Sequence, residues 1–161
     1  MKVLRFIDDN LEEYVLAASF VVTIALIFVQ VVCRYVLRNS LSWSEELARY
    51  IFVWQIWLGA AYAAKIDKHI NITVVRERLP QKTQIVLDFL VLAIWLAFSL
   101  FMVVRGIDVV NSIFKMKQRS PALQIPMGIP YMAVPVGCAL MSFRVAQKIV
   151  TSLPGWKKRW S

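Results

Sequence analysis

The chain has 161 residues, of which 59% are hydrophobic and 18% are charged, and its formal net charge is +9. A soluble domain averages about 45–50% apolar and about 25% charged residues, so this composition argues against a soluble enzyme and against a disordered chain. Excess positive charge first suggests nucleic acid as a partner, but beside long apolar runs the basic residues are better interpreted as signals of membrane orientation.

Four long apolar stretches dominate the chain. A helix that crosses a membrane needs about 20 predominantly apolar residues. The sequence therefore predicts an all-α membrane protein with a single integral membrane domain over residues 1–161, and its spans are expected at about residues 14–35, 48–65, 85–105 and 129–148. The first stretch differs from a cleaved signal peptide, because acidic residues precede it and no small-residue cleavage site follows it.

Residues 42–49 predict an amphipathic interfacial helix before the second span. Ser42 and Glu45 have the spacing of a capping box, and Glu45 and Arg49 have the spacing of an i,i+4 ion pair. Aromatic and aliphatic residues recur at steps of three and four and so share one face, namely Trp43, Leu47, Tyr50 and Trp54. Two interpretations stay open, a capped helix start at the membrane surface or a docking surface for another subunit.

The second span carries mild polar and small residues. Gln55 is interpreted as a hydrogen-bonding group between helices, and Gly59 with Ala63 forms a small-xxx-small pair that admits a close neighbour, either within this chain or from a partner. His69, after this span, is interpreted as a hydrogen-bonded loop residue or, alternatively, as a proton relay.

The third stretch continues in a helical pattern as a helical extension over residues 106–117. This extension is expected either to project about three turns beyond the bilayer or to lie on the surface as a separate helix. Prolines then predict an extended segment from Arg119 to Pro126. Regular helix is expected to begin near Tyr131, with Pro135 in its first turns or at a kink.

Basic residues indicate the orientation of the chain in the membrane. Twelve of the 19 Lys and Arg residues fall in the N-terminal arm, the linker between the second and third spans, and the C-terminal tail, whereas seven fall in the other two linkers. The richer side is expected to be cytoplasmic, which places both termini inside the cell.

The chemistry of enzymes and carriers is sparse in this sequence. No ionisable residue lies near the centre of a predicted span, whereas carriers mark their pathways with such residues. The single His69 argues against paired haem ligands, and Cys33 and Cys138 lie in apolar surroundings typical of inert core thiols. We therefore expect no catalytic residue, no cofactor and no metal site. An accessory subunit is favoured, and an autonomous small four-helix membrane transporter is the alternative.

Six short motifs follow one another over roughly residues 30–145: Arg34-Tyr35, Ser42 to Tyr50, Gly59-Ala60-Ala61, Lys68-His69-Ile70, Ser120-Pro121-Ala122-Leu123 with Pro126, and Pro135-Val136-Gly137. In this order and spacing the chain resembles the small, DctQ-like membrane subunit of tripartite ATP-independent periplasmic (TRAP) transporters. The block from Trp43 to Tyr50 is the most specific of these motifs.

The resemblance implies a role that spacing alone does not give. It implies a scaffold subunit in the bacterial inner membrane, in a stable heterodimer with a large membrane subunit that is driven by sodium. A periplasmic binding protein would deliver an organic acid, of the sialic acid or C4-dicarboxylate type, through a transient contact. Membrane lipids are the remaining partners, and no nucleic acid is expected. The expected partner interface comprises Trp43, Glu45, Glu46, Leu47, Arg49, Tyr50, Trp54 and Gly59.

Overall fold

The structure is a computed structural model that describes residues 2–39, 41–65 and 80–160. Its elements are α1 (Lys2–Tyr35), α2 (Ser42–Lys65), α4 (Gln81–Lys115), α5 (Gly128–Tyr131) and α6 (Ala133–Trp160). Within the described ranges the only β-type pairing is an isolated antiparallel bridge between Arg119 and Pro126. The all-α prediction is therefore confirmed.

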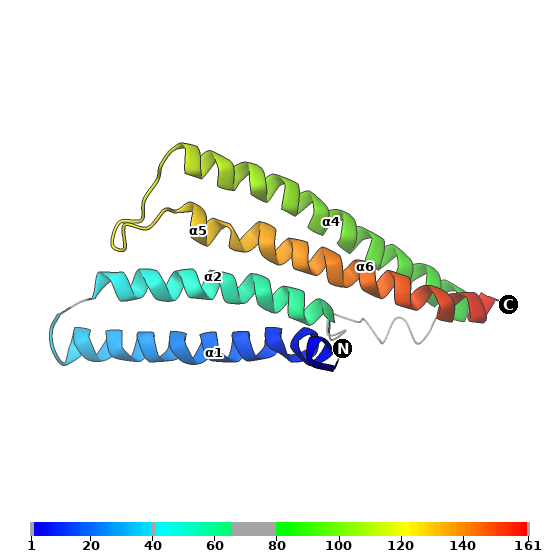
Figure 1. Cartoon of the computed structure of the whole chain (residues 1–161), viewed down its shortest axis with the longest axis horizontal. Helices are drawn as coiled ribbons and strands as arrows, with labels where there is room; N and C mark the ends of the chain where they lie inside the picture. Colours follow the sequence, from blue (N-terminus) through cyan, green and yellow to red (C-terminus); the bar gives the residue numbers. More distant parts are fainter. Residues whose placement is uncertain (1, 40, 66–79, 161) are drawn as a thin grey trace.

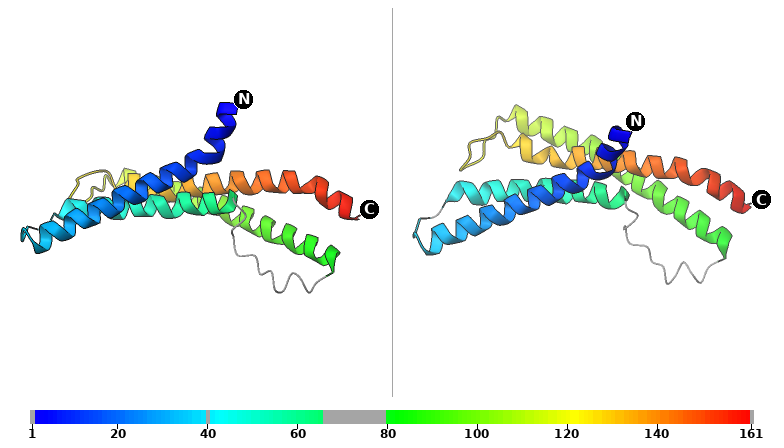
Figure 2. Two further views of the ribbon diagram at one scale, coloured as in Figure 1. Left: turned by 90° about the horizontal axis from the view of Figure 1, so that it is seen from below. Right: turned by 60° about the horizontal axis from the view of Figure 1, so that its bottom comes forward.

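The four long helices lie side by side in the order α1, α2, α6, α4. Each long helix packs along the next in this order, and α5 connects to the start of α6 beside α2 and α4 (Figures 1 and 2). The first turns of α1 and the last turns of α6 lie toward one end of this layer (Figure 1). We call the opposite end, which carries residues 36–39 and 116–127, the distal end. The arrangement is an open layer, and no further helix of the described ranges covers its two broad faces.

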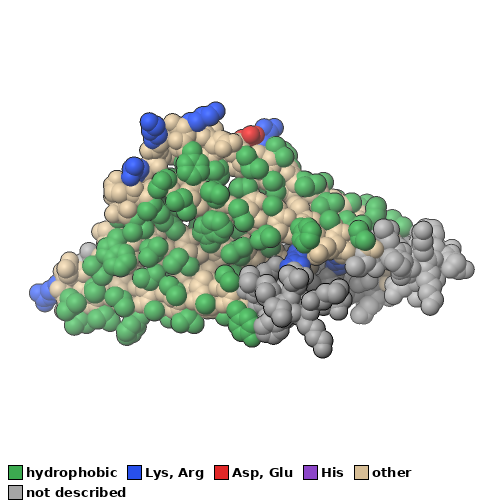
Figure 3. Space-filling view, viewed as in Figure 1, with side chains coloured by type: hydrophobic (Ala, Val, Ile, Leu, Met, Phe, Trp, Pro, Cys, Tyr) green, Lys and Arg blue, Asp and Glu red, His purple; other side chains and the backbone are tan. Residues whose placement is uncertain are grey.

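Among the described residues, three helices are long and apolar enough to cross a membrane, over Tyr14–Tyr35, Val86–Lys115 and Gly128–Val150. In the two outer helices only 6% of the most apolar window is buried inside the chain, against 44% in α6. Figure 3 shows hydrophobic side chains over most of one broad face, with Lys and Arg side chains at its edges. An apolar surface this extensive requires lipid or protein to cover it.

The second predicted span differs from the other three. α2 is not among the helices with a spanning composition, and its first two turns carry the charged residues Glu45, Glu46 and Arg49. Residues 42–49 form the first turns of one continuous α2, as expected for a segment that runs into the second span, and their position at a membrane surface stays a prediction. The Glu45 carboxylate, which the sequence predicts in a capping box with Ser42, binds Gln30 and Arg49.

The helical extension at residues 106–117 belongs to α4, which continues without a break to Lys115. A separate surface helix in this position is therefore wrong. Lys117 follows in the left-handed region with φ 51°, which turns the chain away from the helix axis. The fourth predicted helix begins at α5 and, after Met132, continues as α6 with Pro135 in its first turn, where a missing N–H costs no helical hydrogen bond.

The close contacts between helices use small residues. The buried core joins Ala61 and Ala64 of α2 to Met141 and Val145 of α6. Gly137 of α6 lies against α2, where an added Cβ would come within 2.6 Å of the Trp57 Cβ and 2.9 Å of the Trp57 carbonyl oxygen. Glycine is therefore required at this crossing, since a backbone atom of α2 occupies the space of a side chain.

Two buried polar contacts join neighbouring helices. Gln55 of α2 donates from Nε2 to the hydroxyls of Ser19 and Thr23 on α1, at 3.1 Å and 3.0 Å, which confirms its predicted interhelical role. Ser142 of α6 donates its hydroxyl to the Ser99 hydroxyl of α4 at 2.7 Å. These contacts pair polar groups that would otherwise be costly in an apolar environment.

Candidate functional site

The distal end contains a compact turn between α4 and α5. Ser120 donates its backbone N–H to the Ile125 carbonyl at 2.9 Å, and Met127 donates to the Gln118 carbonyl at 3.0 Å. Gln124 closes the turn by donating to the Ser120 carbonyl, with a φ of 55°. These bonds leave the N–H groups of residues 122 and 123 at the tip of the turn, which we call the 120–127 turn.

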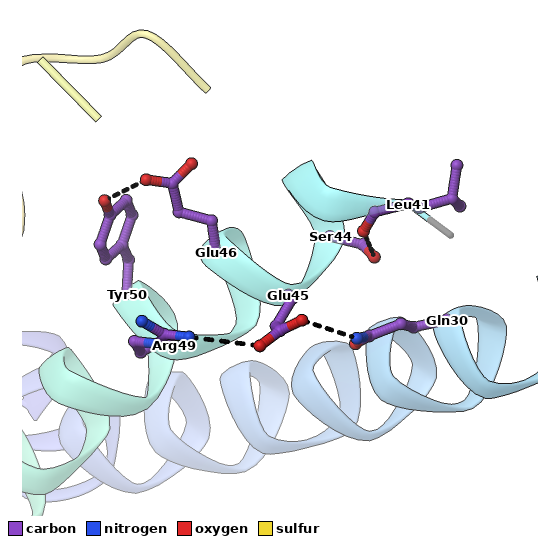
Figure 4. Close-up of polar contacts among 7 residues, drawn as sticks. All are labelled: Gln30, Leu41, Ser44, Glu45, Glu46, Arg49 and Tyr50. Carbon is purple, nitrogen blue, oxygen red and sulfur yellow. Dashed lines mark hydrogen bonds and ion pairs between the residues drawn. The ribbon is translucent and has the colours of Figure 1, made fainter. Parts of the chain in front are cut away.

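Glu46 of α2 binds the tip of the 120–127 turn. One of its carboxylate oxygens, Oε2, accepts the backbone N–H of Ala122 at 2.9 Å and that of Leu123 at 2.8 Å. The other oxygen, Oε1, accepts the Tyr50 hydroxyl from one turn further along α2 (Figure 4). Glu46 is only 8% exposed, so this carboxylate is largely buried and fully engaged.

The protonation of Glu46 follows from these contacts. Burial by itself raises the pKa of the Glu46 carboxyl, but the hydrogen bonds donated by Tyr50, Leu123 and Ala122 outweigh it and hold the pKa below its ordinary value of 4.5. At neutral pH the side chain is therefore ionised. Hydrogen bonds to an ionised acceptor are about twice as strong as those to a neutral one. The Glu46 carboxylate therefore binds the turn more strongly than a neutral side chain would.

The adjacent Glu45 points toward α1 and not toward the 120–127 turn, although it lies at the rim of the cleft described below. Its Oε1 pairs with the Arg49 guanidinium at 3.3 Å, as the i,i+4 spacing predicts, and its Oε2 accepts from Gln30 of α1 at 3.5 Å (Figure 4). The two successive glutamates thus connect α2 to different neighbours, one to α1 and one to the 120–127 turn. Both Glu45 and Arg49 remain mostly exposed, so their ion pair is weak compared with the Glu46 contacts.

A cleft of about 780 Å³ opens beside these contacts. Charged and hydroxyl groups form most of its α2 wall, which ends at the apolar Val53, and the opposite wall is mainly apolar, from the 120–127 turn, α5 and the start of α6. The lining residues are Ser42, Glu45, Glu46, Arg49, Tyr50, Val53, Pro121, Ala122, Met127, Pro130, Tyr131 and Val134. Tyr50 connects the walls, because its hydroxyl lies 3.2 Å from the Met127 sulfur.

The structure divides the predicted interface residues into two groups. Glu45, Glu46, Arg49 and Tyr50 line the cleft or bind neighbouring segments of this chain. Trp43, Leu47, Trp54 and Gly59 lie outside the cleft lining. Trp43 is 44% exposed, and an added Cβ on Gly59 would meet nothing within 4 Å. Among the described residues Gly59 thus has no close neighbour at its Cβ position, and its place in a partner interface stays a prediction.

Sequence reasoning missed the connection between the two ends of the site. The N–H groups that bind Glu46 are 76 and 77 residues away in the chain, and no side-chain type marks a backbone donor. The one available signal is that two of the motifs quoted above, Ser42 to Tyr50 and Ser120 to Pro126, meet in space. The motif around His69 lies outside the described residues, so the structure gives no information on it.

Comparison with known proteins identifies the relatives of this chain. The family model described as "Tripartite ATP-independent periplasmic transporters, DctQ component" matches residues 23–155. The sialic acid TRAP transporter small permease protein SiaQ of Vibrio cholerae is 31% identical over 154 residues, which cover 92% of this chain and 85% of SiaQ. The C4-dicarboxylate TRAP transporter small permease protein DctQ of Rhodobacter capsulatus is 28% identical, over 86% of this chain and 74% of that protein.

A longer relative is also similar. The isethionate TRAP transporter permease protein DctMQ of Oleidesulfovibrio alaskensis is 31% identical over 153 residues, which cover 91% of this chain. The chain spans only 24% of the length of DctMQ, so this similarity concerns one part of a larger permease protein.

Proposed function

The chain belongs to the DctQ-component family of TRAP transporters, and on that premise we propose that it is the small scaffold subunit of a sodium-driven importer of an organic acid. It would form a stable complex with a large membrane subunit in the bacterial inner membrane and meet a periplasmic binding protein transiently. The relatives carry sialic acid, C4-dicarboxylate and isethionate in their names, and all three are organic anions. The substrate class proposed here is accordingly a sialic acid or C4-dicarboxylate type of anion.

The open layer of helices is the observation that carries this proposal. Its broad faces expose large apolar side chains, such as Phe20 of α1 at 57% and Phe101 of α4 at 57%. A carrier that works alone needs a pathway surrounded by helices, whereas a layer that packs edge by edge is suited to widening the frame of another subunit. A partner that slides its transport domain against a fixed frame would benefit from such an addition.

The Glu46 contact supports a fixed frame. It joins the start of α2 to the 120–127 turn between α4 and α5 through one ionised carboxylate. A rigid distal end gives the large subunit and the binding protein a constant surface to meet. The proposal includes four membrane spans, of which α2 is the least apolar. It also places both termini in the cytoplasm.

Association with the large subunit tests the scaffold role. Glu46 has partners within this chain, so its substitution would confound folding with binding, and Trp43→Ala with Trp54→Ala is the cleaner change. We expect the double variant to co-purify less of the large subunit and to lower uptake, whereas Phe98→Ala, on the exposed surface of α4, should not. Undiminished association and uptake in the double variant would refute the assigned interface.

An autonomous transporter is the rival proposal, favoured only by the apolar helices themselves. Liposomes that contain this chain alone, and liposomes that contain it with the large subunit, separate the two proposals when a sodium gradient and the binding protein are supplied. Uptake by the chain alone would overturn the scaffold role. The topology is tested in intact cells, where a tag at either terminus should be inaccessible from the periplasm.

A further inference from the structure

The cleft at the distal end has the chemistry of a site for a lipid headgroup. Its rim carries one cation and one anion side by side, because the Arg49 guanidinium lies 3.3 Å from the Glu45 carboxylate and both side chains are more than half exposed. Exposed ion pairs of this kind contribute little and exchange partners readily. The rim therefore offers a positive and a negative group to a ligand that carries both charges.

The other carboxylate in the cleft is already engaged by the chain. Glu46 stays ionised, but its oxygens accept hydrogen bonds from Ala122, Leu123 and Tyr50, so it is directed at these donors and is not available to a ligand. Arg49 is then the cationic side chain on the lining that faces a phosphate. Guanidinium and phosphate form strong charge-assisted hydrogen bonds.

The position and the floor of the cleft fit the rest of a lipid. Val53, Met127 and Val134 supply an apolar wall. The apolar stretch of α5 and α6 begins at Gly128, so the cleft lies where a span meets the headgroup region. Tyr131, which also lines the cleft, is 44% exposed, and tyrosine is enriched at this depth. A volume of about 780 Å³ lies within the range of about 300–1,000 Å³ usual for small-molecule sites.

We propose that this cleft binds one phospholipid with an ethanolamine headgroup, whose phosphate lies on Arg49, whose ammonium lies on Glu45 and whose first methylenes lie on Val53 and Val134. The bound lipid would fill the space between α2 and the start of α6 and so complete the frame at the distal end. This site goes beyond the scaffold role, and it requires only that the chain lie in a membrane.

Photolabelling of the complex tests the site. The chain and its large subunit are placed in nanodiscs with a phosphatidylethanolamine that carries a photoreactive group near the top of one acyl chain. Labelled peptides of this chain are then mapped by mass spectrometry. We expect labelling at Val53, Met127 and Val134, and the readout remains valid if the large subunit dissociates.

Substitutions at the rim test which side chain binds which charge of the headgroup. Arg49→Gln should lower the labelling by about tenfold, the loss of one charge-assisted contact. Arg105→Gln is the matched control, because Arg105 and Asp108 form a similarly exposed pair on α4, outside the cleft. Glu45→Gln should shift the preference from phosphatidylethanolamine toward phosphatidylglycerol, since it removes the partner of the ammonium and leaves Arg49.

Four results would overturn the proposal. The first is equal labelling in wild type and Arg49→Gln, and the second is an equal loss in Arg105→Gln, which would indicate a non-specific shell of lipid. The third is a crosslink from Val134→Cys to the large subunit, which would mean that protein fills the cleft. Val134→Trp, which fills the floor without changing a charge, should abolish labelling while the complex stays intact, and unchanged labelling in that variant would equally refute the site.

Discussion

The Glu46 carboxylate, in the second turn of α2, accepts the backbone N–H of Leu123 at 2.8 Å across 77 residues of sequence. The same oxygen accepts the N–H of Ala122, so a single atom binds two successive amides at the tip of the 120–127 turn. Two adjacent N–H groups that point to one place form a site for an anion, and here the chain supplies that anion itself. The position of the turn therefore depends on the charge and the reach of one side chain.

Glu46→Ala and Glu46→Gln should loosen the turn to different degrees. In Glu46→Ala both amides lose their acceptor, and we expect their hydrogen exchange to become about tenfold faster. In Glu46→Gln the amide oxygen can take the place of Oε2, whereas the side-chain NH₂ that faces Tyr50 can donate but not accept, so the charge and the bond donated by Tyr50 are lost while the turn keeps an acceptor, and the effect should be intermediate. Hydrogen exchange followed by mass spectrometry on peptides covering residues 119–127 measures the exchange rates, which should rise from wild type through Glu46→Gln to Glu46→Ala.

Glu45→Gln is the control for this series, because Glu45 binds Gln30 and Arg49 and does not contact the turn. Its exchange over residues 119–127 should equal that of the wild type. Equal exchange in Glu46→Ala and in Glu45→Gln would contradict the role assigned to Glu46.

The hold on the turn should weaken in acid. Because the folded-state pKa of Glu46 lies below its ordinary value of 4.5, its contribution to stability is complete above the unfolded-state pKa and is lost as pH falls through the folded-state pKa. The difference in unfolding temperature between wild type and Glu46→Gln should therefore be constant from neutral pH to about pH 5 and shrink at lower pH. A difference that persists unchanged at pH 3 would contradict this assignment.

The order of elements was predictable because apolar runs and prolines fix helices locally. The ion pair of Glu45 with Arg49 and the interhelical contact of Gln55 followed in the same way from spacing and from the cost of polar groups among apolar ones. Both are short-range arguments, in which one side chain has few possible partners.

Contacts that depend on the lateral order of helices were not predictable. The sequence treats Gly59 and Gly137 alike, yet only Gly137 lies at a crossing, because α6 packs between α2 and α4 and α1 covers the other side of α2. Likewise Glu46 and Glu45 are neighbours with the same side chain, and their different roles arise from amides that lie 76 and 77 residues away from Glu46. Backbone donors carry no mark in the sequence, so the Glu46 site required the structure.

Gly137→Ala and Gly59→Ala form a matched pair. The added methyl at residue 137 would meet the Trp57 carbonyl oxygen, which cannot move without shifting α2, so we expect a loss of about 1–3 kcal/mol in stability. At residue 59 the methyl meets open space, and the better helix propensity of alanine should leave stability unchanged or raise it by up to about 1 kcal/mol. The unfolding midpoints of both variants in detergent micelles measure this difference. Equal losses of stability in Gly137→Ala and Gly59→Ala would contradict the prediction.

Gln55→Leu should change stability by less than about 1 kcal/mol, although it removes two interhelical hydrogen bonds. The Ser19 and Thr23 hydroxyls already donate to carbonyls of their own helix, so both act as acceptors toward Gln55, and neither is left with an unpaired donor in the variant. The substitution also removes the Gln55 Oε1, a buried oxygen without a hydrogen-bond partner among the described residues. Hydrogen bonds between membrane helices contribute about 0.6 kcal/mol on average, and the removal of this unpaired acceptor offsets much of that loss.

Gln55→Glu is the contrasting variant, because it places an ionisable group among apolar helices and should destabilise the α1–α2 contact strongly at neutral pH. The unfolding midpoints of wild type, Gln55→Leu and Gln55→Glu in the same micelles test both expectations. A large loss of stability in Gln55→Leu would show that the two hydrogen bonds dominate this contact.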